Sequence, residues 1–416
     1  DALQLYRDLV ESQSESTDLQ LDVAGTHTRI GNILGMLGKR DEAKQHFADS
    51  QRLFETHKDQ ITTEGVAWAR NDFEWGNLLS QEAEYEQAGT YYQQAVDRLL
   101  EWQPELSQLE SREIFVRSLL GIAGIASDRS QFPLAFDALA EAEPVLHQAL
   151  ADGARKPLFQ NLLGRLLLRR GQLHLKQLAL EDAIQQLTAA QTQFRELTQA
   201  ETVFPDFRQG LATASLLLGQ ALLQHQAPEQ ADVAFAAAVA EARQLMTDFP
   251  LGAYKTVMLH ALNSQGHAYL IRGRYGDAVG VFAEAADLAE SMRTRNPVPT
   301  ALLKIGKAHL LLGYSQRLDG NLEDAESSLL TAHETIQAVV DNDPSIEVSQ
   351  MEFAVVLFEL AELRANQDRL AEAIEYSRQA VAHQERIAAE NPAQATRLPS
   401  FTTQLEELEA RQATDD

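Results

Sequence analysis

The sequence contains no cysteine among its 416 residues. Disulfide bonds and thiolate-ligated metal sites are therefore excluded for this chain, and the redox compartment stays open. No apolar stretch approaches the roughly 18 residues of a membrane-spanning helix, and no signal-peptide pattern is visible. We expect the chain as given to be soluble.

Positive charge is also scarce. Lys and Arg together number 35 against 61 Asp and Glu, which gives a formal net charge of -26. A field of that sign repels nucleic acid and anionic lipid, so we predict neither nucleic-acid binding nor direct membrane contact. Part of the acidity has a local cause, because carboxylates such as Asp277 fall in the first turn of predicted helices, where they interact favourably with the helix dipole.

Catalytic signatures are absent as well. The stretch from Gly31 to Arg40 superficially resembles a phosphate-binding loop, but too many residues separate its glycines, and Arg40 stands where Ser or Thr would hold magnesium. No nucleophile elbow, zinc-protease motif or dinucleotide fingerprint occurs. His260 and His267 share a helical face, but two imidazoles do not make a typical zinc site. We predict no catalytic residues, no metal and no cofactor.

What the sequence does contain is a repeated unit of two helices. The unit is clearest between residues 262 and 285, where small and aromatic residues follow the offsets of a tetratricopeptide (TPR) helix-turn-helix. Those residues are Gly266, Tyr269, Gly273, Tyr275, Ala278, Phe282 and Ala285. The stretch closely resembles a TPR repeat, in which small residues let two antiparallel helices approach each other.

The unit recurs eight times in one register. An alanine that opens each second helix marks it: Ala43, Ala88, Ala135, Ala183, Ala231, Ala278, Ala325 and Ala373. Each is preceded, at a fixed offset in the first helix, by a small residue: Gly31, Gly76, Ala123, Gly171, Gly219, Gly266, Gly313 and Ala361. We expect each small residue to face the marker alanine. The spacing of about 47 residues is longer than the usual 34 of a TPR and matches HEAT repeats, but the register of small residues favours TPR.

These patterns predict an all-α fold. We expect a right-handed α-α superhelix of about eight TPR-like helix pairs, with a period of about 47 residues and a C-terminal capping helix, in one solenoid over residues 1–416. The predicted intervals are 1–15 for a partial helix, 16–60, 61–105, 106–156, 157–204, 205–249, 250–296, 297–343 and 344–391 for the repeats, and 392–413 for the cap. Residues Thr414 to Asp416 should be disordered.

The resemblance extends beyond the repeat type. The loop Phe204-Pro205-Asp206-Phe207-Arg208 and the Leu-Gly turn that follows it look like the C-terminal helical-repeat regions of some bacterial serine/threonine protein kinases. In that family the repeats follow a catalytic domain and often a membrane span. The chain opens at Asp1 without Met and carries none of the kinase motifs, so we expect a fragment of a longer protein. The resemblance implies kinase chemistry before Asp1 and a tether to a membrane there, and it leaves the localisation open.

Function should lie on the concave surface, which the first helices of a helix-pair solenoid line. Two positions on each first helix face this groove in the TPR pattern, and they carry basic or hydrogen-bonding side chains. The candidates are Arg70, Arg117, Arg165, His260 and Lys307 at one position, and Asn32, Asn77, Gln172, Gln220, His267 and Tyr314 at the other. Either they are ordinary solvated helix residues, or they bind an extended peptide or protein segment that is acidic or phosphorylated.

The sequence therefore predicts a non-catalytic scaffold for protein-protein interaction. The resemblance implies the regulatory or partner-recruiting region of a bacterial serine/threonine protein kinase. A free-standing TPR adaptor is the first alternative. A small-molecule-sensing or enzymatic repeat protein is the second, and it is disfavoured because no convergent set of acid, base and nucleophile is visible.

Overall fold

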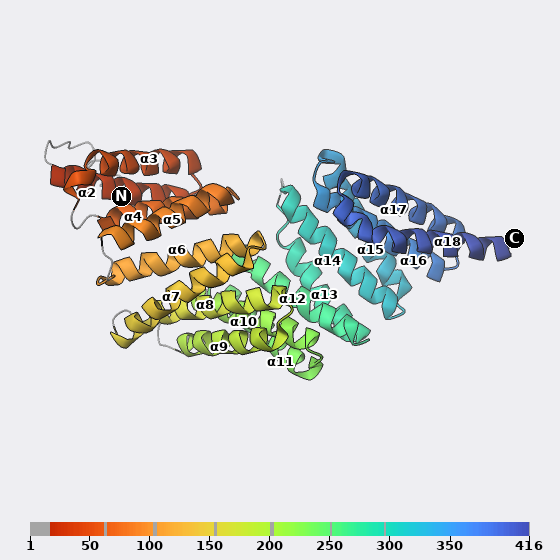
Figure 1. The fold of residues 1–416 in the computed structure, drawn as a ribbon. Coiled ribbons are helices and arrows are strands. Elements are labelled where there is room, and N and C mark those ends of the chain that lie inside the picture. The colour runs from red at the N-terminus through yellow and green to blue at the C-terminus, as the bar shows by residue number, and fades with distance from the viewer. Residues whose placement is uncertain are drawn as a thin grey trace. The chain divides into compact units, whose positions relative to one another are not determined.

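The structure, a computed structural model, describes residues 17–61, 65–102, 106–153, 156–199, 204–249, 252–294 and 297–415. The partial helix expected over residues 1–15 lies outside these ranges. Everything described is helix, turn or loop (Figure 1). Among the described helices, none combines the length and the apolar character needed to cross a bilayer.

The helices alternate as first and second members of antiparallel pairs. The first helices are α2 (Thr17–Met36), α4 (Gly65–Gln81), α6 (Leu109–Asp128), α8 (Lys156–Lys176), α10 (Pro205–Gln224), α12 (Gly252–Ile271), α14 (Pro299–Leu318) and α16 (Glu347–Asn366). The second helices are α3 (Arg40–Thr56), α5 (Tyr85–Trp102), α7 (Phe132–Ala151), α9 (Leu180–Thr198), α11 (Pro228–Asp248), α13 (Tyr275–Glu290), α15 (Leu322–Asn342) and α17 (Leu370–Glu390). Short 3₁₀ turns, η1 (Lys58–Gln60) and η2 (Pro392–Arg397), follow α3 and α17.

A final helix, α18 (Leu398–Asp415), covers the last pair. Its Phe401 ring packs against Phe358 of α16 at a centroid distance of 4.9 Å, and Gln404 donates a hydrogen bond to the Phe358 carbonyl oxygen at 3.1 Å. The predicted all-α fold of TPR-like helix pairs with a C-terminal cap is confirmed. The expected disorder at the end of the chain was wrong for Thr414 and Asp415, which continue α18.

Contacts within the chain divide it into two compact units. Unit 1 comprises residues 1–221 and unit 2 comprises residues 222–416, so the division falls near the end of α10. Within each unit, successive helices pack against each other, and α9 meets α10 through a cluster that contains Phe194 and Phe207. The single solenoid expected over the whole chain stays a prediction.

The turn inside each pair is closed by one residue in the left-handed region, which ends the first helix and reverses the chain. These residues, with their φ angles in degrees, are Gly38 (76), Ala83 (62), Ser130 (59), Leu178 (59), Gln226 (60), Gly273 (68), Gly320 (87) and Asp368 (59). Glycine adopts such angles without strain, whereas the other residue types do so at a cost. The turn is therefore set by its position between two packed helices more than by its residue type.

The small residues of the first helices bring each pair together. A Cβ atom on Gly266 would lie 2.5 Å from the Phe282 ring, and one on Gly171 would lie 2.5 Å from the Leu187 side chain. The nearest neighbour is thus the large residue one turn after the marker alanine, and not the alanine itself as the sequence suggested. These glycines leave room for the large side chains that fill the interior of their pairs.

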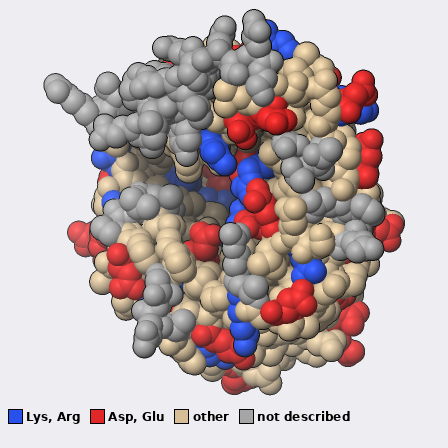
Figure 2. Space-filling model, turned by 90° about the vertical axis from the view of Figure 1, so that its left-hand side faces the viewer, with Lys and Arg blue, Asp and Glu red and all other residues tan. Residues whose placement is uncertain are grey.

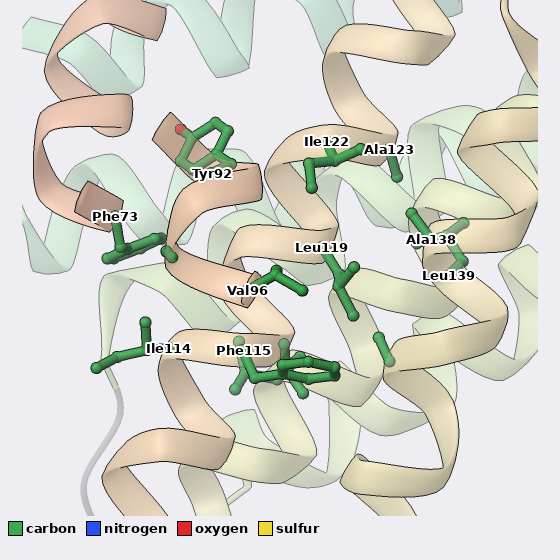
Figure 3. Close-up of a cluster of buried hydrophobic side chains, with 14 of the residues drawn as sticks. Phe73, Tyr92, Val96, Ile114, Phe115, Leu119, Ile122, Ala123, Ala138 and Leu139 are labelled. Atoms are coloured by element: carbon green, nitrogen blue, oxygen red, sulfur yellow. The ribbon is translucent and has the colours of Figure 1, made fainter. Parts of the chain in front are cut away.

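In unit 1 the helices from α4 to α8 share one apolar core (Figure 3). The Phe73 ring of α4 packs against the Tyr92 ring of α5 at a centroid distance of 6.0 Å, and Leu119 of α6 and Leu139 of α7 belong to the same cluster. The Tyr92 ring is 4 % exposed, and its hydroxyl donates to Asn77 Oδ1 at 2.9 Å. Residues from consecutive repeats therefore bury one another, and no pair could hide its apolar face alone.

A buried ion pair lies in the same unit. Asp72 of α4 is fully buried, and Arg98 Nε donates to its Oδ2 at 2.5 Å while the guanidinium lies 3.5 Å from the Trp68 ring centroid. Burial raises the pKa of the Asp72 carboxyl to about 7, although Arg98 acts to lower it. The free-energy cost of removing this carboxylate from water therefore exceeds what its one cation returns.

Substitution of Gly266 tests the close approach of the helices. Gly266→Ala should lower the free energy of unfolding by about 1–3 kcal/mol, because the fully buried Phe282 ring cannot retreat from the new methyl group. Gly280 of α13 is the matched control, since its Cβ would meet nothing within 4 Å. Gly280→Ala should raise stability by up to about 1 kcal/mol. Urea unfolding and hydrogen exchange of α12 and α13 measure both effects, and equal effects of the two substitutions would contradict the packing described here.

The buried carboxyl of Asp72 predicts a pH dependence. Its pKa is about 7 in the folded protein and about 4 in an unfolded chain. Between those values the folded state binds a proton that the unfolded state lacks, so this group's contribution to stability falls as the pH rises. The difference in free energy of unfolding between the wild type and Asp72→Asn should therefore decrease from pH 4.5 to pH 7.5. A difference that increased instead would show that Arg98 dominates the ionisation.

Candidate functional site

Three adjoining hollows run along the first helices of unit 1. The first, of about 260 Å³, lies between α2 and α4, the second is about 270 Å³, and the third is about 420 Å³ and reaches α6, α8 and α10. Asn32 lines the first and second hollows, and Asn77 lines the second and third. Neighbouring hollows thus share lining residues, and we call the row of three hollows the unit 1 groove.

Both signs of charge meet in this part of the surface. Figure 2 shows Lys and Arg atoms gathered within a hollow, with Asp and Glu atoms beside them and over the outer surface. Arg70 lines the first hollow of the unit 1 groove, and Arg117 and Arg165 line the third. The structure therefore brings Arg117 and Arg165 together and places Arg70 in the neighbouring part of the same groove.

Most groove-facing cations already have an anionic partner. Arg70 pairs with Glu110 at 2.8 Å and Arg165 with Asp206 at 2.9 Å, and each carboxylate lies in the first turn of the next first helix.

The same holds for the remaining predicted cations that carry a full charge. Arg117 pairs with Glu113 of its own helix at 3.2 Å, and in unit 2 Lys307 of α14 pairs with Glu352 of α16 at 2.7 Å. Such partly exposed pairs contribute about 0–1 kcal/mol each, so a ligand can replace the internal carboxylate at little cost.

Among the predicted amide side chains, Asn77 and Gln172 already form hydrogen bonds within the protein, whereas Asn32 differs from them. Asn77 accepts a hydrogen bond from Tyr92 and donates one to Glu74 at 3.2 Å, and Gln172 accepts one from Arg169 at 3.1 Å. Asn32 is half-buried and lines two hollows, and its side chain makes no hydrogen bond within the described part of the chain. Asn32 is therefore the amide best placed to bind a ligand in the groove. Gln220 lies half-buried near the end of unit 1.

The predicted residues of unit 2 lie on α12 and α14. Burial, reinforced by Lys304 and Lys307, lowers the pKa of His260. Burial and Lys307 likewise lower the pKa of His267, whose ring packs edge-on against Phe282 at 5.7 Å. Both imidazoles are neutral at pH 7 and add no positive charge to this surface.

Tyr314, on α14, completes the predicted set. Burial raises the pKa of its hydroxyl, and the Arg317 guanidinium lies 5.5 Å from the centroid of its ring. Arg317 in turn pairs with Glu359 at 2.8 Å. The Tyr314 ring therefore belongs to a charged cluster between α14 and α16, in which its neighbours are occupied with one another.

Two groove residues were missed by the sequence analysis. Arg169 and Asn161 both line the third hollow, on the same face of α8 as Arg165. Arg169 lies over Gly124, whose Cβ would be 3.2 Å from a guanidinium nitrogen, and Asn161 is 5 % exposed. Their spacing of four residues on either side of Arg165 is the signal that identifies them, because residues i, i+4 and i+8 share a helical face.

The comparisons with known proteins support the fold and go no further. No family model matches the sequence, and no curated protein matches it. Among solved structures, the chain is similar to a signal-transduction ATPase of the STAND type from Pyrococcus horikoshii, which carries a tetratricopeptide repeat sensor. The TM-score is 0.59 at 11 % identity, and the match covers 96 % of this chain but only 54 % of the ATPase chain.

The apo form of RapI is a second similar structure. Its TM-score is 0.58 at 12 % identity, with 93 % of this chain and 98 % of RapI covered. Identities this low show a common architecture and carry no information on ligands. The resemblance to repeat regions of bacterial kinases stays a prediction. The chain has the fold of an all-α, TPR-like helical-repeat protein.

Proposed function

We propose that this chain is a non-catalytic scaffold that binds an extended peptide or protein segment in the unit 1 groove. The observation that carries the proposal is the row of three hollows along successive first helices, in which neighbouring hollows share Asn32 or Asn77 as a lining residue. Packed helices lie about 10 Å apart, and an extended chain rises about 3.3 Å per residue. A bound segment would therefore advance about three residues for each repeat that it passes.

The chemistry of the groove favours binding over catalysis. Its charged side chains are mostly held in ion pairs such as Arg70 with Glu110, and its remaining polar side chains are amides and hydroxyls. Such groups orient a partner by hydrogen bonds and charge, whereas catalysis needs an acid, a base or a nucleophile in reach of one reacting atom. This is the support for a scaffold over an enzymatic or small-molecule-sensing repeat protein.

A more specific assignment of the parent protein and its partner rests on the sequence resemblance alone. On that basis we propose a regulatory or partner-recruiting region of a bacterial serine/threonine protein kinase, whose partner is an acidic or phosphorylated segment. A free-standing TPR adaptor is the alternative. Sequencing the native reading frame upstream of Asp1 separates them, because a kinase domain there supports the first assignment, and further repeats behind a start codon support the second.

The binding of segments in the unit 1 groove is tested with a displayed library of random 12-residue peptides, selected against the full chain. Enriched peptides should lose affinity by about tenfold or more for Asn32→Trp, because the indole fills the junction of two hollows. Asn32→Ala, which removes only the amide, should give a smaller loss. Calorimetry measures the affinities, and thermal unfolding confirms that each variant folds.

The matched control is Gln93→Trp, which places the same ring on the exposed face of α5. It should leave the affinity unchanged. The proposal fails if no peptide is enriched, or if the enriched peptides bind Asn32→Trp as tightly as they bind the wild type.

A further inference from the structure

We propose that the third hollow of the unit 1 groove contains a subsite for one phosphoryl group, formed by Arg169, Arg165 and Asn161. The inference rests on the proposed function, in which the groove binds a segment, and it specifies the chemistry of one side chain on that segment. The three residues project from consecutive turns of α8 into the same hollow. They supply two guanidinium groups and one amide, all of which can donate hydrogen bonds to an anion.

Arg169 is the centre of the subsite. Within the described part of the chain, no carboxylate lies at ion-pair distance from its guanidinium, which instead donates to the neutral Gln172. Asp128, the carboxylate whose charge acts on Arg169, forms an ion pair with Lys176 at 3.2 Å. Burial lowers the pKa of Arg169, Asp128 acts in the opposite direction, and Arg165 lowers the pKa further. A poorly solvated cation thus lies beside another cation, which is an arrangement that an incoming anion would relieve.

Asn161 supplies an independent sign of an incomplete site. The residue is 5 % exposed, lines the hollow, and its Oδ1 is buried without a hydrogen-bond partner among the described residues. Buried polar side chains are usually satisfied, so this amide is incomplete without a ligand. The oxygen itself only accepts hydrogen bonds, but a half-turn of the amide exchanges it for the NH2 group, which can donate to a phosphoryl oxygen. Gly124 contributes by having no side chain where the Arg169 guanidinium lies.

Because Arg165 is already paired with a carboxylate, its ion pair indicates how much negative charge a ligand must carry. Arg165 is held by Asp206 at 2.9 Å, and both side chains are about half exposed. A ligand carboxylate would exchange one monoanion for another and gain little. A phosphoryl group carries close to two negative charges at neutral pH and three acceptor oxygens, so it can engage Arg165 and Arg169 together. The geometry therefore favours a phosphorylated side chain over Asp or Glu.

The experiment uses the full chain and two small probes, N-acetyl-O-phosphoserine methylamide and its aspartate counterpart, titrated at constant ionic strength and pH 7.5. Arg169→Gln should weaken binding of the phosphoserine probe by about tenfold or more, since it removes a charge-assisted contact. Asp206→Asn should strengthen binding several-fold, because it releases Arg165 from its internal partner. A loss of structure alone would not produce changes in opposite directions.

Arg195→Gln is the matched control. It removes the same charge from the exposed surface of α9 and should change the affinity by less than about twofold. Equal effects of Arg169→Gln and Arg195→Gln would overturn the subsite, since only general attraction would remain. Aspartate binding as tight as phosphoserine binding would overturn its phosphoryl specificity.

The experiments distinguish a failure of the phosphoryl subsite from a failure of the proposed groove function. Asn32 lines the other two hollows, so Asn32→Trp should leave binding of the phosphoserine probe intact. If library peptides bind and Arg169→Gln has no effect on the probe, the subsite fails while the groove function stands. If the probe binds through Arg169 and no peptide is enriched, the subsite stands and the groove function fails.

Discussion

The close approach of the two helices in each pair is the constraint on which the structure depends. Gly266 lies beneath the Phe282 ring, and the same relation holds between Gly171 and Leu187 and between Gly313 and Leu329. A helix that presents its small residue inward must turn its opposite side away from its partner. The unit 1 groove is lined by the flank of the first helices, where Asn32 directly follows Gly31 and Asn77 directly follows Gly76. The packing that holds these pairs together therefore also fixes the direction in which the flanking side chains point.

Helix length decides how much binding surface each repeat offers. The first helices run to about 20 residues, which corresponds to roughly 30 Å along the helix axis. On α8 this length allows Asn161, Arg165 and Arg169 to lie on successive turns of one face. The extra residues of each long repeat therefore do not lie in loops alone. They also lengthen the helices, and the added turns carry side chains into the groove.

The fold was predictable because its signals are local. Small residues such as Gly31 recur at a fixed offset from the marker alanine, and this register reports the contact between two helices that follow each other directly. The ion pairs were not predictable in the same way. Arg70 meets Glu110 of the next first helix, and which carboxylate it reaches depends on how successive pairs rotate against each other. Arg169 escaped notice because only two positions of each repeat were considered.

In the proposed binding groove, the internal ion pairs would provide a selectivity that a bare row of arginines would lack. In a protein of net charge -26, free groove cations would attract any acidic segment, including the protein's own surface. Pairing Arg70 with Glu110 and Arg165 with Asp206 cancels that attraction and leaves a contact that can be exchanged. A ligand then gains affinity only where it offers more charge or better geometry than the carboxylate it displaces. Discrimination of this kind comes from the cost imposed on the wrong partner as much as from the attraction of the right one.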